Sequence, residues 1–212
     1  MRKVLLLCGI LSSLLYTAMN ILVPSQFQGY SSASQTVSEL SAIGAPTRAL
    51  WLPLGLIYTL LFTAFGFGVR ISAHQNRRLF TAGTMIIIYG LISLAWPFAP
   101  MHLRGAEFTV TDAMHITLGI VTVILMLVIM TFGLVAFNNW FRTYSILSLL
   151  IFVVFGILTG IDAPRLADNL PTPWLGVWER INIGVFMLWV FVLAIILWRE
   201  SESSIRKGGN NN

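Results

Sequence analysis

Long apolar runs alternate with short polar segments along this chain, and six of the runs are long enough to cross a membrane. A helix needs about 20 residues to span the hydrocarbon, roughly twice the length of a barrel strand. The pattern therefore predicts helical spans over residues 4–23, 49–69, 79–98, 113–137, 143–161 and 174–198. The predicted fold class is all-α, a polytopic integral membrane bundle of six transmembrane helices.

The first apolar run follows Arg2 and Lys3, which is also the charge pattern of a secretory signal peptide. The run is longer than the apolar core of a signal peptide, and no small-x-small cleavage site follows it. We therefore interpret it as an uncleaved first span. We expect one six-helix transmembrane domain over residues 1–200 and a disordered cytoplasmic tail over residues 201–212.

Composition supports the membrane class, because hydrophobic residues make up 57% of the chain and charged residues 10%. A soluble domain of this size would have too little polar area to cover so much apolar surface. The sequence thus predicts a multi-pass protein of the cell membrane, with the lipid bilayer as its immediate partner.

Basic residues indicate the orientation of the spans. Nine Lys and Arg residues fall in segments that are cytoplasmic if the N-terminus is inside, and four fall outside (Arg48, Arg104, Arg165 and Arg180). This bias predicts that both termini are cytoplasmic. The net charge of +5 then reflects topology and attraction to anionic headgroups, so we expect no nucleic-acid partner. Six of the seven tryptophans fall near predicted span ends, and the exception, Trp189, is expected to pack between helices.

Residues 31–48 form the longest polar interruption before the tail. Thr36 and Glu39 have the T-x-x-E spacing of a capping box, in which hydroxyl and carboxylate close the first turn of a helix reciprocally. Val37 and Leu40 lie on one side of that turn. We therefore predict an ordered segment with at least one helical turn over the outer mouth of the bundle.

Two interpretations of this segment remain open. In the structural one, Glu39 caps the turn, and Ser38 and Ser41 are solvated. In the functional one, the segment is a re-entrant lip over a polar cavity, and Glu39 is its acid.

Asp112 and His115 lie three residues apart at the start of the fourth span and share a helix face. In the structural interpretation, Thr111 is the N-cap and Asp112 a first-turn acid stabilised by the helix dipole. His115 is then an interfacial side chain bonded to a neighbour.

Glu179 and Arg180 lie one or two turns inside the sixth span, at headgroup depth, where ionisable residues face protein or a water-filled cavity. They form either a structural ion pair or one wall of an outward-facing site shared with Asp112, His115 and Glu39. Adjacent helical residues point about 100° apart. We therefore expect Arg180 to pair with Asp112 or Glu39 and not with Glu179.

Three motifs resemble a prokaryotic membrane family catalogued as domain of unknown function 998. They are the segment SELSAIGAPTR at residues 38–48, the D-x-x-H pair that opens span four, and GVWERI at residues 176–181. That family has no established activity, so the resemblance implies a location and a fold but no chemistry. It implies that the positions of interest are Ser38, Glu39, Asp112, His115, Glu179 and Arg180.

Three function classes remain. A module that binds or senses a small solute, cation or lipid headgroup fits best, because the acids face outward and no nucleophile–base pair is evident. The enzyme alternative is a lipid hydrolase, since Ser38, Asp112, His102 and His115 resemble residues of ceramidase-like zinc hydrolases. The chain lacks the H-x-x-x-H pair of those hydrolases, so it cannot form their histidine-rich zinc site. In a zinc-dependent hydrolase, the metal ligands would instead be His115, Asp112 and Glu179.

A transporter is the third class, although the spans offer few polar residues near mid-membrane. We predict no metal or cofactor. The sequence leaves the catalytic residues, any reaction and the oligomeric state open.

Overall fold

The computed structural model describes residues 1–138 and 140–209, except for the side chains of residues 167 and 203–209. Six long helices account for most of these residues. They are α1 (Arg2–Leu22), α2 (Arg48–Ser72), α3 (Arg77–Ser93), α4 (Val110–Ala136), α5 (Trp140–Ala167) and α6 (Leu175–Gly209). Three short 3₁₀ turns lie in the connections: η1 (Val23–Gln26), η2 (Val37–Ser41) and η3 (Trp96–Phe98).

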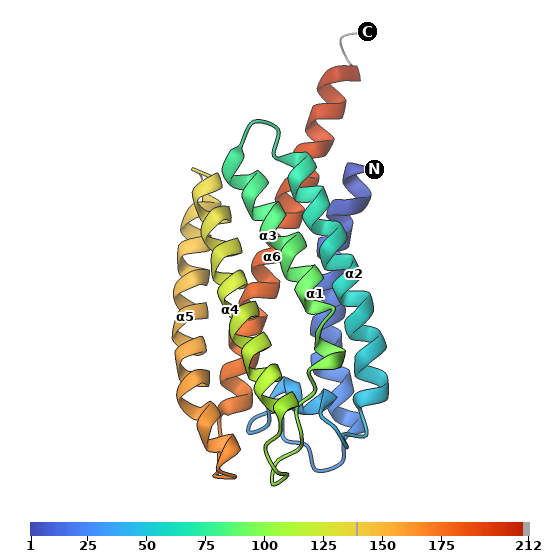
Figure 1. Cartoon of the computed structure of the whole chain (residues 1–212). Coiled ribbons are helices and arrows are strands. Elements are labelled where there is room, and N and C mark those ends of the chain that lie inside the picture. Colours follow the sequence, from blue (N-terminus) through green and yellow to red (C-terminus); the bar gives the residue numbers. More distant parts are fainter. Residues whose placement is uncertain (139, 210–212) are drawn as a thin grey trace.

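The helices follow one another around a closed ring, in which each packs against its neighbours in the chain and α6 returns to α1 (Figure 1). The chain begins and ends at one end of the bundle. At the opposite end, which we call the loop end, the connections at residues 23–47, 94–109 and 168–174 come together (Figure 1).

The six predicted spans are confirmed, because each long helix is apolar and long enough to cross a membrane. The large apolar side chains of Leu147, Leu150 and Ile157 on α5 are exposed, as lipid-facing positions should be. The cytoplasmic placement of the termini stays a prediction. Helix α6 continues to Gly209, although the sequence predicted a disordered tail from residue 201. Glu and Lys in this stretch are good helix formers, and residues 210–212 lie outside the described part.

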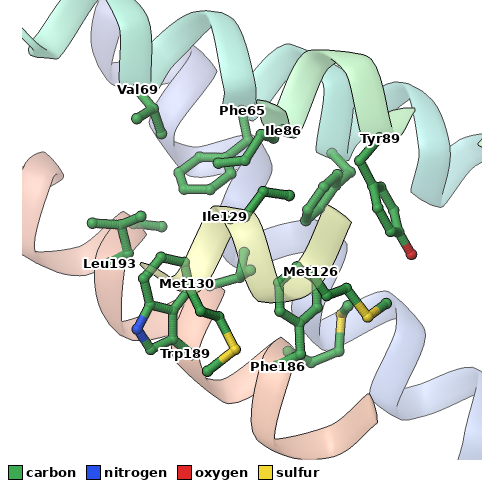
Figure 2. Close-up of a cluster of buried hydrophobic side chains, with 14 of the residues drawn as sticks. Phe65, Val69, Ile86, Tyr89, Met126, Ile129, Met130, Phe186, Trp189 and Leu193 are labelled. Atoms are coloured by element: carbon green, nitrogen blue, oxygen red, sulfur yellow. The ribbon is translucent and has the colours of Figure 1, made fainter. Parts of the chain in front are cut away.

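The core lies at the centre of the ring, where side chains from α2, α3, α4 and α6 meet (Figure 2). Trp189 is fully buried and its Nε1 donates a hydrogen bond to Ser145 Oγ at 2.8 Å, which confirms that it packs between helices. Gly133 provides the space, because a Cβ at that position would collide with the indole ring. Close packing of this kind and interhelical hydrogen bonds hold a membrane bundle together, since lipid tails are as apolar as the helices.

Candidate functional site

Residues 31–47, which we call the lid, cross the loop end between α1 and α2 (Figure 1). The lid contains η2, and Thr36 is its N-cap. The backbone N–H of Thr36 donates to Glu39 Oε2 at 2.7 Å, while the backbone N–H of Glu39 donates to Thr36 Oγ1 at 3.3 Å. The predicted capping box and helical turn are therefore confirmed.

Glu39 is fully buried, and its carboxylate is the centre of the lid's polar network. Arg104 binds it with two N–H groups, Nε to Oε1 at 2.7 Å and Nη2 to Oε2 at 3.0 Å. Gln35 Nε2 donates to Oε1 at 3.2 Å, and Thr36 donates through its backbone and hydroxyl. Because these five donors occupy both oxygens, Glu39 anchors the lid to Arg104 and to the first turn of η2.

Arg104 also joins the lid to the other connections at the loop end. Its Nη1 donates to Thr172 Oγ1 at 2.7 Å and its Nη2 to the carbonyl of Ser34 at 2.6 Å. In the sequence, Arg104 is one of the four outer basic residues, and no motif there assigns it to the site. No local pattern links it to Glu39, since the two residues are 65 positions apart.

The first turns of α6 hold the lid from another side. The backbone N–H of Val37 donates to Glu179 Oε2 at 2.5 Å, and that of Val177 donates to the carbonyl of Ala33 at 3.1 Å. Arg180 Nη1 donates to the carbonyls of Ser32 and Gln35 at 2.8 and 2.9 Å. The lid therefore wraps around the start of α6.

The predicted pairing of Arg180 with Asp112 or Glu39 is wrong. Within the described residues, Arg180 has no carboxylate at ion-pair distance. Both expected partners are engaged elsewhere, Glu39 by Arg104 and Asp112 by His102. Backbone carbonyls of the lid take their place, because a half-buried guanidinium needs acceptor oxygens whatever their charge.

Tyr30 links Arg180 to the lid through its hydroxyl group. Its hydroxyl accepts a hydrogen bond from Arg180 Nη2 at 2.5 Å and donates one to the carbonyl of Thr36 at 2.6 Å. Burial raises the pKa of Tyr30 to about 12, although the nearby Arg180 opposes the rise. The phenol therefore stays protonated at neutral pH and can continue to donate to the lid.

Asp112 lies at the edge of this network. It caps α4 by accepting from the backbone N–H of Thr109 at 2.9 Å, so the N-cap is Thr109 and the prediction of Thr111 is wrong. Thr109 and Asp112 have T-x-x-D spacing, a signal that matches the box in the lid. The other partner of Asp112 is His102, whose Nδ1 lies 2.8 Å from Oδ2.

His102 connects Asp112 to the lid through the backbone. Ile43 and His102 form an isolated parallel bridge, in which the N–H of Ile43 donates to the carbonyl of Met101 at 2.8 Å. The α3–α4 connection and the lid are therefore joined by main-chain as well as side-chain contacts.

The remaining predicted residues contribute less to this arrangement. His115 Nδ1 lies 2.8 Å from the carbonyl of Ala99, and its ring lies against Trp96, which agrees with the structural interpretation. Ser38 is half-buried within η2, and its carbonyl accepts from Ser41 Oγ at 3.0 Å. Among the described residues, no three His, Cys, Asp or Glu side chains gather as metal ligands would.

Comparison with protein families gives one match that covers most of the chain. The model of the family described as "Protein of unknown function (DUF998)" matches residues 10–196. No curated protein and no solved structure matches the chain.

Proposed function

The chain belongs to the DUF998 family, whose function is unknown, and from its geometry we propose that it is a membrane-embedded binding or sensing module. Its ligand is a small solute, a cation or a lipid headgroup that approaches the loop end from outside the cell membrane. The lid covers this site and regulates access to it.

The observation that carries the proposal is the way the lid is held. A connection between two spans needs only enough chain length to join them. This one buries the carboxylate of Glu39 completely, and Arg104, Glu179 and Arg180 form hydrogen bonds with its backbone. Burying charges costs free energy that apolar packing would not cost. Such a network is suited to hold the lid in one defined closed conformation. A ligand that binds the open conformation more tightly can then shift the equilibrium between the two.

The geometry gives less support to a hydrolase. A hydrolase needs a nucleophile in hydrogen-bond reach of its base. His102 is oriented by Asp112 as a general base would be, but within the described residues neither His102 nor His115 bonds to a Ser or Thr hydroxyl. Asp112 has a structural task in any case, because it caps α4.

Gly176 allows a direct test of the lid. A Cβ at Gly176 would collide with the carbonyl oxygens of Ser32 and Gln35, whereas nothing lies within 4 Å of a Cβ at Gly184 on the same helix. Gly176→Ala should therefore displace the lid, and Gly184→Ala is the matched control. Both variants and the wild type are purified with native lipids, and retained ligands are surveyed by native mass spectrometry.

We expect a bound small molecule or specific lipid on the wild type and on Gly184→Ala. Gly176→Ala should retain about tenfold less, a loss of about 1.4 kcal/mol in binding free energy. Equal retention by all three proteins, or no retained molecule on any of them, would overturn the proposal.

A further inference from the structure

A cavity of about 450 Å³ lies at the turn between α2 and α3, and it is lined by His74, Gln75, Arg77 and Phe80. The turn lies at the end of the bundle that carries both termini, opposite the lid (Figure 1). Because α2 and α3 are both long and apolar enough to cross a membrane, residues 73–76 join them where the spans leave the hydrocarbon. The cavity is therefore at the level of lipid headgroups.

The polar side chains that line the cavity supply hydrogen-bond donors. Arg2 Nη1 lies 3.3 Å from His74 Nε2, and a guanidinium can only donate, so Nε2 accepts and Nδ1 carries the ring proton. Gln75 and Arg77 add amide and guanidinium N–H groups. None of the described residues that line the cavity is acidic, and the chain has no Asp or Glu between positions 40 and 106. The cavity therefore suits a ligand that is anionic and rich in acceptors.

Arg77 is the cation that this end of the bundle leaves without a partner. Among the described residues, its guanidinium has neither a hydrogen bond nor an ion pair. The neighbouring arginines are engaged, because Arg78 Nη1 donates to the carbonyl of Val135 at 2.8 Å, and Arg2 interacts with His74 and electrostatically with Glu200. The five donors of Arg77 are therefore available to a bound anion.

The turn that presents these donors is fixed at both sides. Asn76 caps α3, with Oδ1 accepting from the backbone N–H of Leu79 at 3.1 Å. Its Nδ2 donates to the carbonyl of Ala136 at the end of α4, at 2.9 Å. A ligand that binds here does not have to order the turn, which lowers the entropic cost of binding.

The remaining wall of the cavity is apolar. The side chain of Phe80 is 44% exposed, and Arg70 Cζ lies 4.4 Å from the centroid of its ring. From this point α3 runs into the membrane. An anion site that continues into an exposed apolar surface fits an amphipathic ligand better than a free anion.

We propose that this cavity binds the headgroup of an anionic phospholipid. The phosphate accepts hydrogen bonds from Arg77, His74 and Gln75, and the acyl chains lie along Phe80. Arginine forms two parallel bonds with a phosphate, and a polar amide and imidazole complete the donor set. This site is independent of the proposed function, because it lies at the other end of the bundle from the lid.

The test compares two lipids with the same acyl chains. The full chain is placed in nanodiscs that contain equal amounts of phosphatidylglycerol and phosphatidylcholine, and the lipids that it retains are counted by native mass spectrometry. Both lipids have a phosphate, but the choline ammonium cancels its charge. We expect the wild type to prefer phosphatidylglycerol by about fivefold or more, because each basic residue near an anionic surface contributes a factor of about five.

Arg77→Gln should lower this preference by about fivefold. The variant should fold normally, since the guanidinium of Arg77 holds no other described residue. Arg77→Lys keeps the charge and should retain more of the preference than Arg77→Gln. Arg142→Gln is the matched control, because Arg142 is an exposed basic residue at the same end of the bundle that does not line the cavity. It should behave as the wild type.

Equal retention of the two lipids by the wild type, or an unchanged preference in Arg77→Gln, would overturn this inference. An equal loss in Arg77→Gln and Arg142→Gln would also overturn it, since it would show general attraction to the membrane surface and no defined site. Displacement of the retained lipid by free glycerol phosphate would contradict the assignment to a lipid. Gly176→Ala leaves this cavity intact, so a lipid bound here is distinguished from a ligand beneath the lid by its loss in Arg77→Gln.

Discussion

The guanidinium of Arg104 meets the carboxylate of Glu39 with two parallel hydrogen bonds, Nε to Oε1 at 2.7 Å and Nη2 to Oε2 at 3.0 Å. Glu39 has no exposed side-chain surface, and Arg104 retains 23%. This pair holds the lid against the α3–α4 connection, so the arrangement of the loop end depends on it.

Arg104→Met should destabilise the protein strongly, because it leaves the charge of Glu39 buried without a counter-ion. Breaking one side of a buried ion pair costs about 3–5 kcal/mol. The double variant with Glu39→Gln should be less destabilised than Arg104→Met alone. Denaturant titration in mild detergent measures the free energy of unfolding of the single variants and of the double variant. If the double variant were as unstable as the sum of the two single ones, the pair would not be coupled.

Arg180→Ala should destabilise the protein by about 2–3 kcal/mol, because it removes charge-assisted hydrogen bonds to the lid carbonyls. Arg165→Ala is the comparison, since Arg165 is exposed and its Nε donates to one carbonyl, that of Pro171. We expect that change to cost less than about 1 kcal/mol. The same unfolding experiment ranks the two, and equal losses would mean that Arg180 does not anchor the lid.

Gly133→Ala should destabilise the core by about 1–3 kcal/mol, the usual cost of overpacking. Its Cβ would collide with the ring of Trp189. Gly119→Ala on the same helix has nothing within 4 Å of its Cβ and should be neutral or slightly stabilising. Thermal unfolding monitored by tryptophan fluorescence separates the variants, and a neutral Gly133→Ala would contradict the packing at the centre of the ring.

The orientation of the bundle can be tested with reporter fusions. The distribution of basic residues predicts that fusions at Gln75 and Gly209 report the cytoplasm and that one at Gly105 reports the exterior. Gly105 follows Arg104, which binds Glu39 of the lid, so Gly105 and the lid lie at the same end of the bundle. An external signal from Gly209 would place the lid on the cytoplasmic side and remove the outward-facing site.

The parts of the fold that depend on local sequence were predictable. Span number follows from the lengths of the apolar runs, and the turn at Thr36–Glu39 follows from a spacing that acts within one helical turn. The packing of Trp189 was predictable as well. A tryptophan in the middle of a span is far from both membrane–water interfaces, so it packs against other helices.

The partners of the charged residues were not predictable, because they depend on how three connections fold over one another. Arg104 reaches Glu39 across 65 positions. Arg180 was expected to need a carboxylate, but the carbonyls of the lid satisfy it, and no sequence pattern marks a carbonyl as a partner. The Thr109 cap was within reach of sequence reasoning, since its spacing to Asp112 repeats that of Thr36 to Glu39.

Amide hydrogen exchange across residues 34–43, measured in nanodiscs without added ligand, tests the closed lid most directly. We expect slow exchange at Val37 and Glu39, whose amides donate to Glu179 and Thr36, and faster exchange at both positions in Arg104→Met. Fast exchange throughout residues 34–43 of the wild type would show that the segment is not held over the loop end.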